Sequence, residues 1–301
     1  MTSTTQLVLA GGGHSHALLL HRWAMHPRHR PEGLITLVNR SSTSLYSGMV
    51  PGLIARLYSR DQVAIDLRRL AADAGVAFVE AEIQGLDLTG QTLQLEGRLP
   101  LPFTQLSLDL GAISRPIAPD QSLTAACWVP IKPLEPALTF LDSQDANTSE
   151  TFHVLGSGLA GVEVALALKQ RWPKRSIHLL ARQGRLDPNL VKALQVADVR
   201  IMHQPAGAPA AIALETSSAG LICSGSRAPS WLASSGLPCC TQSGRVRTNN
   251  QLQVIEHPTI FASGDCAVID TDPRPPSGVW AVRAAVPLAR NLEAACHNKP
   301  L

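Results

Sequence analysis

The chain has 301 residues, of which 45% are apolar, 4% aromatic and 16% charged, and its formal net charge is +3. This balance is typical of a globular protein of about two domains and excludes a charge-rich disordered chain. The mild charge, without a dense Lys/Arg run interleaved with aromatic residues, argues against nucleic-acid binding.

No apolar run is long enough to span a bilayer, and residues 1–6 lack the apolar core of a signal peptide, so we expect a soluble, cytoplasmic protein. The six cysteines show no C-x-x-C and no metal-ligand spacing, so we expect no metal site. The adjacent Cys239 and Cys240 are interpreted as two thiols, with a strained redox disulfide as the alternative.

The first motif is Leu7–Leu20 (LVLAGGGHSHALLL), in which an apolar strand runs through three glycines into a helix that begins near His14. Gly11 and Gly13 allow a sharp turn and a close approach to a pyrophosphate, and the helix start directs N–H groups and its positive dipole end at it. His16 stands where G-x-G-x-x-G has its third glycine. Either the helix packs differently there, or His16 faces the ligand.

The next strand is predicted at Gly33–Asn39, apolar as a strand covered on both faces would be. It ends at Asn39–Arg40, where a ribose-binding acid is usual, so only a hydrogen bond to the ribose remains available. In Ser41–Tyr58, glycines and a proline break any long helix. This segment either lines a pocket for a flat aromatic ligand or is a packed connection.

The middle of the chain predicts a helix, a hairpin, a buried strand and a linker. The ranges are a helix at Asp61–Ala74, strands at Val76–Leu88 and Leu93–Leu95 joined at Thr89–Gly90, a strand at Leu106–Leu110 before Gly111, a proline-rich linker at Arg115–Pro136 and a polar stretch at Ser143–Glu150.

The opening pattern then recurs. A strand at Phe152–Leu155 leads into a complete G-x-G-x-x-G at 156–161, a helix at Val162–Arg171 and a strand at Ser176–Ala181. Two such turns, about 145 residues apart, are far more specific than one, and they predict two bound dinucleotides.

The end of this second unit bears on nucleotide choice. Arg182, with Arg185 close behind, stands where an NAD site has an acid, which favours a 2′-phosphate and NADPH. The alternative is that Arg182 is a surface cation and the site has decayed. Glu163 at the helix start either is stabilised by the helix dipole or lies near the reacting rings.

The last third predicts weak strands at Val199–His203 and Ala211–Glu215, and then a third landmark at Thr259–Val268. There a buried strand and a glycine turn precede Asp265, a position suited to binding the sugar-alcohol hydroxyls of a flavin. The final helix, Gly278–Ala295, contains Pro287, which predicts a kink or a helix start at that point.

These landmarks resemble the pyridine nucleotide–disulfide oxidoreductase superfamily, in particular its type II NADH dehydrogenase-like branch. GGGHSH at 11–16, YSGMVPGL at 46–53 and FASGDCA at 261–267 are more closely similar to the flavoprotein module fused to some selenide, water dikinases. The resemblance implies an α/β fold of two three-layer, Rossmann-like dinucleotide-binding domains. A discontinuous FAD domain (1–118 and 239–301) would hold a shortened NAD(P) domain (119–238) as an insertion.

The resemblance also implies which residues bind FAD and NAD(P)H. Asp265 would bind the ribitol and Glu163 would lie near the nicotinamide as a positioning group. The expected cofactor-binding residues are Gly11, Gly12, Gly13, His14, Ser15, His16, Asn39, Arg40, Tyr46, Ser47, Gly48, Met49, Pro51, Gly111, Gly156, Gly158, Gly161, Arg182, Gly264, Asp265 and Ala267.

The implied activity is an FAD-dependent NAD(P)H oxidoreductase that passes electrons to a small-molecule acceptor such as a quinone. One alternative is a sulfur- or selenium-linked flavoprotein, similar to sulfide:quinone reductases, that uses Cys127, Cys223 or the Cys239–Cys240 pair. Another is a flavin-binding subunit without turnover. Relatives continue into a C-terminal domain for dimer or membrane contact, so the chain is expected to be a fragment or naturally truncated. A peripheral membrane surface or a dikinase is the implied partner, and the oligomeric state stays open.

Overall fold

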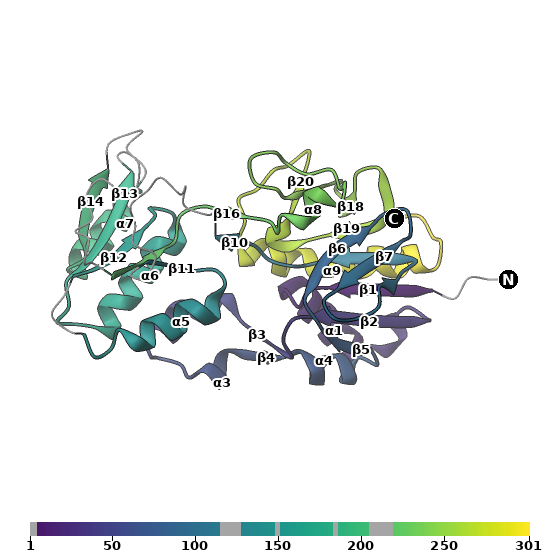
Figure 1. Cartoon of the computed structure of the whole chain (residues 1–301), viewed down its shortest axis with the longest axis horizontal. Coiled ribbons are helices and arrows are strands. Elements are labelled where there is room, and N and C mark those ends of the chain that lie inside the picture. The colour runs from purple at the N-terminus through teal and green to yellow at the C-terminus, as the bar shows by residue number, and fades with distance from the viewer. Residues whose placement is uncertain (1–4, 115–127, 148–150, 183–185, 205–218) are drawn as a thin grey trace. The chain divides into compact units, whose positions relative to one another are not determined.

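The structure is a computed structural model that describes residues 5–114, 128–147, 151–182, 186–204 and 219–301. The chain forms two compact units (Figure 1). Unit 1 comprises Met1–Ser47, Ala64–Ala112 and Arg227–Leu301, and unit 2 comprises Gly48–Val63 and Ile113–Ser226. Unit 2 therefore begins and ends earlier than the expected inserted domain, and it also takes a segment near residue 50.

Unit 1 is built on an eight-stranded sheet in which the five consecutive strands at one end are parallel. In spatial order its strands are β20 (Ala267–Ile269), β17 (Val246–Thr248), β18 (Gln253–Val254), β19 (His257–Ala262), β9 (Gln105–Leu108), β1 (Gln6–Ala10), β2 (Leu34–Asn39) and β5 (Ala77–Glu80). The strand β1 lies between β2 and β9, in the middle of the five parallel strands, so the first glycine turn leaves the centre of this parallel part.

Helices cover one face of this sheet. They are α1 (His14–Met25), α4 (Leu67–Asp73) and α9 (Gly278–Cys296). Alternate residues of β1, Leu7 and Leu9, pack against apolar side chains of these helices, among them Trp23 of α1 and Leu288 of α9. Burial of this face is the main source of stability for the layer, since each large apolar side chain contributes about 1.5–3 kcal/mol.

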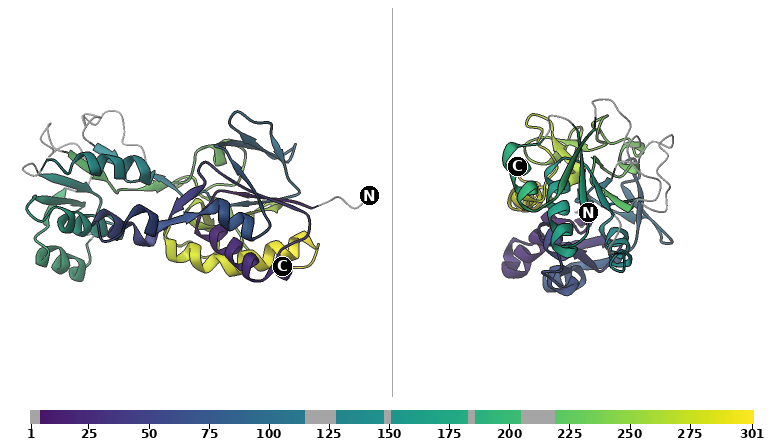
Figure 2. Two further views of the ribbon diagram at one scale, coloured as in Figure 1. Left: turned by 90° about the horizontal axis from the view of Figure 1, so that it is seen from below. Right: turned by 90° about the vertical axis from the view of Figure 1, so that its left-hand side faces the viewer.

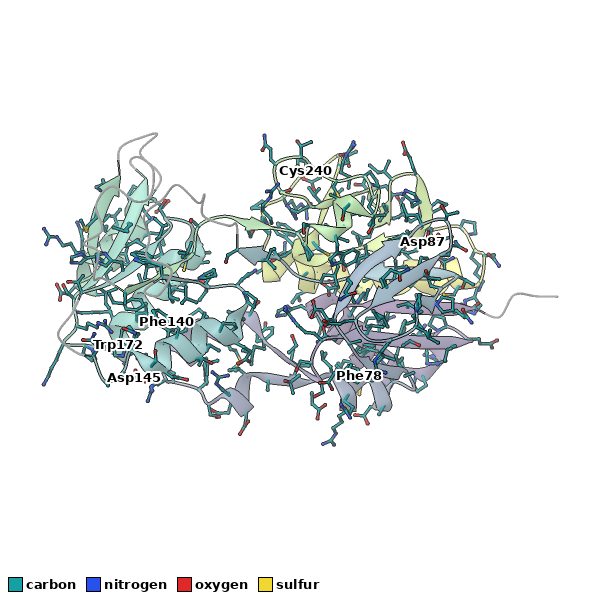
Figure 3. All side chains as sticks on the ribbon, viewed as in Figure 1. Phe78, Asp87, Phe140, Asp145, Trp172 and Cys240 are labelled. Carbon is teal, nitrogen blue, oxygen red and sulfur yellow. The ribbon has the colours of Figure 1, made fainter. Side chains whose placement is uncertain are left out.

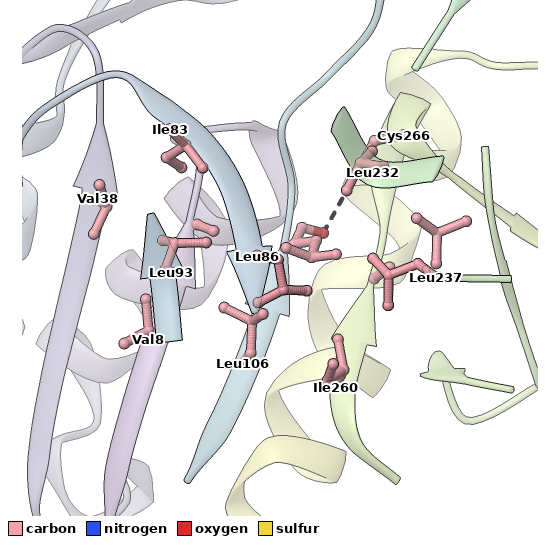
Figure 4. Packing of buried hydrophobic residues seen from close by; sticks show 14 of the residues in the cluster. Val8, Val38, Ile83, Leu86, Leu93, Leu106, Leu232, Leu237, Ile260 and Cys266 are labelled. Carbon is pink, nitrogen blue, oxygen red and sulfur yellow. Dashed lines mark hydrogen bonds between the residues drawn. The ribbon is translucent and has the colours of Figure 1, made fainter. Parts of the chain in front are cut away.

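The other face of the sheet is covered by a second, smaller sheet of β6 (Ile83–Asp87), β7 (Thr92–Leu95) and β8 (Leu101–Pro102), and by the short helix α8 (Trp231–Ser234). Val8 of β1 and Leu106 of β9 pack there against Leu86 and Leu93 (Figure 4). Figure 2 shows α9 (yellow) and these strands on opposite sides of the central sheet. Unit 1 therefore has three layers.

Two predicted elements of unit 1 are wrong in their extent. The expected helix at 61–74 is interrupted: α3 (Arg60–Val63) is followed by β4 (Ala64–Asp66), which pairs antiparallel with β3 (Thr43–Leu45). The Asp66 side chain then accepts a hydrogen bond from the Arg69 N–H at 2.9 Å and caps a new helix, α4. An aspartate is a strong N-cap residue, and it starts a helix here rather than continuing one.

The expected strand at 76–88 is likewise two strands, because the chain leaves the central sheet after β5 and enters the small sheet at β6. The hairpin at Thr89–Gly90 is confirmed, with the Asp87 carboxylate accepting from both N–H groups. The final helix begins at Gly278, with the Ser277 side chain as its cap, and runs through Pro287, so no helix starts at that proline.

Unit 2 contains a five-stranded parallel sheet in the order β11 (Trp128–Pro130), β15 (Ala219–Ile222), β12 (Phe152–Leu155), β13 (Ile177–Arg182) and β14 (Arg200–Gln204). Its helices are α2 (Val50–Ile54), α3, α5 (Leu134–Ser143), α6 (Leu159–Arg171) and α7 (Pro188–Val196). The strand predicted at 199–203 is present as β14, and the one predicted at 211–215 lies outside the described residues. The remaining short elements of the chain are η1 (Pro27–His29), η2 (Ser47–Met49), η3 (Gly264–Cys266), β10 (Ile113–Ser114) and β16 (Ser226–Arg227).

Residues 48–63 belong to unit 2 because α2 packs against α6, and ion pairs add to this contact. Arg56 pairs with Asp145, and Arg60 pairs with Glu135 on α5. Asp145 also accepts hydrogen bonds from Arg171 at 2.7–2.8 Å and from the Trp172 indole at 2.8 Å (Figure 3). The Arg171 hydrogen bond is the largest cause that lowers the pKa of the Asp145 carboxyl.

One row of side chains crosses the sheet of unit 2 in register: Trp128, Gly220, His153, His178 and Arg200. A Cβ on Gly220 would lie 2.5 Å from the Trp128 ring, so the glycine leaves the space that brings this indole to 5.9 Å from the His153 ring. The two imidazoles are 5.2 Å apart.

This row predicts acid lability. Burial, with the neighbouring His178 as the second cause, lowers the pKa of His153 from 6.5 to about 4. An unfolded chain therefore takes up this proton near pH 6.5, and the folded chain does not until about pH 4. Stability is fully present above pH 6.5 and falls as the pH drops through this window, by on the order of 1–3 kcal/mol.

Urea unfolding between pH 7.5 and pH 4 measures this slope. The H153Q variant is expected to reduce this slope, with buried His16 contributing to what remains. H203Q, which changes an exposed histidine on β14 at the edge of the same sheet, is expected to leave the slope unchanged. Equal slopes in wild type and H153Q would show that another group causes the acid transition.

Candidate functional site

The two glycine turns have the same backbone geometry, each within its own unit. Gly11 and Gly156 adopt positive φ angles of 96° and 131°. Their N–H groups donate to the carbonyl of the next parallel strand, Gly11 to Val38 at 2.8 Å and Gly156 to Leu180 at 3.1 Å. Each turn thus leaves a central strand at its carboxyl end, the edge at which ligands bind in open parallel sheets.

Both turns also open onto a helix whose N-cap residue is a glycine. Gly13 caps α1 with φ −70° and ψ 177°, and Gly158 caps α6 with φ −73° and ψ 167°. Neither cap residue supplies a side-chain hydrogen bond, and neither helix has an acidic residue in its first turn. In α1 the His16 N–H is bonded to the Asp109 carboxylate, and the other first-turn N–H groups and the positive end of each dipole are arranged for an anion.

The two turns differ at the third glycine position, and the structure explains the difference. A Cβ on Gly161 would lie 2.0 Å from the Gly156 carbonyl oxygen, so this contact requires glycine. The equivalent residue of the first turn, His16, instead places Nδ1 at 2.7 Å from the Gly11 carbonyl oxygen. The imidazole bonds to the same carbonyl against which Gly161 packs.

The His16 ring is fully buried, and both of its nitrogens are bonded. A carbonyl only accepts, so Nδ1 carries the proton toward Gly11, and Nε2 accepts from the Ser107 hydroxyl at 2.7 Å. Burial lowers the pKa of His16, which keeps the ring neutral in this arrangement. The sequence left two alternatives for His16: a helix that packs differently at this position, or a side chain that faces the ligand. These contacts favour the first.

A residue that the sequence analysis did not single out, Asp109, lies at the centre of the first turn. Its side chain is 2% exposed, and its Oδ2 accepts from the N–H of His16 at 3.0 Å. Its backbone carbonyl accepts from the Gly13 N–H at 3.1 Å. The available signal was an acid inside the largely apolar run LSLDLG, two residues before a glycine.

Asp109 also explains why glycines surround it. A Cβ on Gly13 would lie 2.3 Å from this carboxylate, and one on Gly264 would lie 2.4 Å from Oδ1. Gly264 has φ 66° and directly precedes Asp265. The carboxylate therefore connects the first turn with the turn that carries the predicted ribitol-binding acid.

The other predicted residues of unit 1 mostly brace this turn. Asn39 Oδ1 accepts from Gly12 N–H at 2.9 Å, and its amide nitrogen donates to the Ser41 carbonyl. The Ser15 hydroxyl is buried and donates to the Ala281 carbonyl of α9 at 2.9 Å. Arg40 is exposed.

His14 connects the start of α1 with the following predicted segment. Its Nε2 accepts from the N–H of Ser47 at 3.2 Å, and its ring lies 5.2 Å from that of Tyr46. The remaining residues of this segment, Gly48, Met49 and Pro51, belong to unit 2, in which α2 packs against α6. Val50, Leu53 and Ile54 are buried, so the second half of the segment is a packed connection.

The predicted residues at the turn after β19 and at Gly111 differ in burial and in backbone conformation. Asp265 lies half-buried in η3. Ala267 is 6% exposed and is part of the apolar cluster that faces β6 and β7. Gly111 has φ 70°, and nothing lies within 4 Å of the place that a Cβ would take, so its backbone conformation alone requires glycine.

The second turn leaves more open space. Nothing lies within 4 Å of the position of a Cβ on Gly158, so packing within the described residues does not require this glycine. Leu159 beside it is 62% exposed, and Glu163 is exposed on the same helix. Arg182 ends β13, its side chain lies outside the described residues, and so does all of Arg185.

No cluster of three or more His, Cys, Asp or Glu side chains in the described residues is arranged to hold a metal ion. Likewise, none of the described helices has the length and apolar character needed to cross a membrane.

Comparisons with known proteins support the fold. No family model and no curated protein matches the sequence. Among solved structures, reduced CoADR-RHD of Bacillus anthracis is 17% identical, with a TM-score of 0.79 over 98% of this chain. The water-forming NADH oxidase of Lactobacillus brevis, bound to NADH, is 16% identical, with a TM-score of 0.77 over 96% of this chain and 69% of its own.

The sulfide:quinone oxidoreductase of Aquifex aeolicus is 15% identical, with a TM-score of 0.75 over 98% of this chain and 78% of its own. The chain spans 57% of the length of the Bacillus anthracis protein. These similarities confirm the predicted α/β fold with two Rossmann-like domains.

The shape of the first turn predicts the effect of small substitutions. G13A places a methyl group on a buried carboxylate that the His16 N–H holds in place, so we expect it to lower the free energy of unfolding by about 2–4 kcal/mol. G158A, at the matched position of the second turn, is expected to change it by less than about 0.5 kcal/mol. Urea unfolding measures both variants, and an equal effect of the two would contradict this description of the turns.

Proposed function

We propose that the chain is an FAD-dependent oxidoreductase that accepts electrons from NAD(P)H and passes them to a small acceptor. The observation that carries the proposal is that each unit holds a glycine turn at the carboxyl end of a parallel strand, followed by a helix whose N-cap residue is a glycine without a side-chain cap. One such turn per unit suits one diphosphate per unit. FAD, when bound, supplies the electron-transfer chemistry, and the protein supplies binding and orientation.

Unit 1 is the proposed FAD-binding unit. The N–H groups of His14 and Ser15 at the start of α1 would bind the pyrophosphate, since that of His16 is bonded to Asp109. Gly11–Gly13 would shape the turn, since their own N–H groups are bonded to Val38, Asn39 and Asp109. Asp265 would accept hydrogen bonds from the ribitol. The His14–Tyr46 pair would border the flavin ring.

Unit 2 is the proposed NAD(P)-binding unit. The open space at Gly158 fits the close approach of a pyrophosphate, and exposed Leu159 offers an apolar surface beside it. Glu163 would position the nicotinamide. On sequence grounds Arg182 would contact a 2′-phosphate.

The acceptor belongs to the proposal at the level of class only. Solved structures with this fold include a water-forming NADH oxidase and a sulfide:quinone oxidoreductase, so molecular oxygen and quinones are the acceptors to test first. The closer resemblance to the module fused to selenide, water dikinases finds no support in the comparisons, and a dikinase or membrane partner stays a prediction from short motifs.

The experiment is anaerobic reduction. The reconstituted protein is expected to be yellow, and one equivalent of NADPH or NADH is expected to bleach it. G158A is expected to keep the flavin and its absorbance but to need at least about tenfold more nucleotide for the same rate. A yellow protein inert to both nucleotides would instead support a flavin-binding subunit without turnover.

Nucleotide preference tests Arg182 separately. The wild-type protein is expected to prefer NADPH, and R182D is expected to reverse the preference, because a carboxylate repels a 2′-phosphate and binds a ribose diol. Comparison of kcat/KM for the two nucleotides measures this. A clear preference of the wild type for NADH would remove the proposed role.

A sulfur-linked activity is the second candidate, and Cys240 favours it. Hydrogen bonding by Ser243 lowers the pKa of this thiol, whereas burial raises the pKa of Cys239 and brings that of Cys223 to about 12. A thiolate is the nucleophile in sulfur chemistry, so Cys240 (Figure 3) is the one we expect to react first among the described cysteines. Cys127 lies outside the described residues.

Alkylation with iodoacetamide at pH 7.5 is expected to label Cys240 first, as measured by peptide mass spectrometry, and to label Cys223 only on unfolding. The variant C240S is expected to lose turnover of reduced sulfur if the second candidate holds. Unchanged sulfide consumption by C240S would dismiss this candidate and leave the NAD(P)H activity in place.

A further inference from the structure

Unit 1 contains a cavity beside the predicted ribitol-binding turn, with Gly264 on its wall. It has a volume of about 170 Å³ and lies between the first half of α9, the strands β17 and β20 at one end of the sheet, and the segment 272–277. A water needs only about 10–15 Å³ of such space, so the cavity has room for a small organic molecule.

Two buried polar groups on its wall lack partners among the described residues. The Ser263 side chain is 2% exposed, and its hydroxyl makes no hydrogen bond there. The Arg245 Nε is also buried and unbonded in this part of the chain, while its Nη1 donates to the Arg274 carbonyl at 2.9 Å. A buried donor without a partner destabilises the folded chain, so a ligand that bonds to both groups has a physical reason to bind.

The wall is also positively charged. It contains Arg245, Arg274 and Arg283, against the single acid Asp272, which pairs with Arg274. Arg283 has no carboxylate in ion-pair range among the described residues. The N-terminus of the 19-residue helix α9 opens onto the same space and adds its positive dipole end.

The cations are held in place by an aromatic ring. The guanidinium of Arg274 lies 4.0 Å from the centroid of the Trp280 ring, and that of Arg283 lies 5.0 Å from it. Stacked guanidinium groups keep their N–H donors free at the edge, a geometry that suits carboxylate or phosphate oxygens. Asp265, whose charge acts on Arg245, is the nearby acid that opposes an anion.

We propose that this cavity binds a small organic anion, through a carboxylate or phosphate group, at Arg245, Ser263 and Arg283. The site is separate from the predicted FAD diphosphate site at the start of α1. A ligand there would contact the end of β19, which leads into Gly264 and Asp265. Binding of the anion is therefore expected to change the affinity of the proposed ribitol site.

Calorimetric titration of the full chain with inorganic phosphate and with benzoate tests the site. Saturable binding of at least one of them, one per chain, is expected. Phosphate binding alone identifies a phosphate site, and benzoate binding alone identifies a carboxylate site with an apolar neighbour. If neither anion binds with a Kd below about 10 mM, which corresponds to a binding free energy of about −3 kcal/mol, the proposal is overturned.

Matched variants separate a site from general charge. R283A is expected to weaken binding at least tenfold, and R290A, an exposed arginine on the same helix outside the cavity wall, is expected to leave it unchanged. Equal weakening by both would mean nonspecific attraction to a basic helix.

Ser263 provides a readout that a structural role would not give. S263A removes an unbonded buried hydroxyl, so the urea midpoint is expected to stay the same or rise, while the anion Kd rises about fivefold. A lower midpoint with an unchanged Kd would overturn the role of Ser263.

Competition with FAD distinguishes this inference from the proposed function. Flavin uptake that leaves the anion bound supports two sites, whereas one-for-one displacement would assign the cavity to the flavin site and overturn the proposal. Anion binding by a chain that takes up no flavin would keep this inference and end the proposed function instead.

Discussion

The carboxylate of Asp109 is the constraint on which the first nucleotide turn depends. It accepts a hydrogen bond from the His16 N–H at the start of α1. It also occupies the space that a Cβ on Gly13 or Gly264 would need. The same residue's backbone carbonyl accepts from Gly13. Three segments far apart in the sequence thus meet at one buried acid, and the two glycines are required because nothing larger fits against it.

The second turn reaches the same backbone conformation without such an acid. Gly161 packs on the Gly156 carbonyl, where the first turn has the His16 imidazole bonded to the Gly11 carbonyl. The side chains of Asp109 and His16 thus fill the space around the first turn, whereas the second turn has open space at Gly158. This difference suits a tightly held cofactor in unit 1 and an exchanging one in unit 2, and such a pair is what the proposed oxidoreductase requires.

The sequence predicted the repeated strand–glycine–helix pattern, because short-range glycine spacing and apolar runs determine it. It also predicted the hairpin at Thr89–Gly90 and the final helix. Pairing between strands that are distant in the sequence could not be predicted from it. Ala64–Asp66, for example, forms a strand only because Thr43–Leu45 lies beside it. Asp109 was missed for the same reason, since an acid in an apolar strand acquires its meaning from the helix start and the Gly264 turn that the fold brings to it.

Equilibrium dialysis of the flavin-free chain against FAD and NADPH together tests the central claim most directly. The account predicts that each chain binds one FAD and one nicotinamide nucleotide at the same time, with neither displacing the other. A chain that binds no FAD, or that exchanges one nucleotide for the other at a single site, would contradict the assignment of one dinucleotide to each glycine turn.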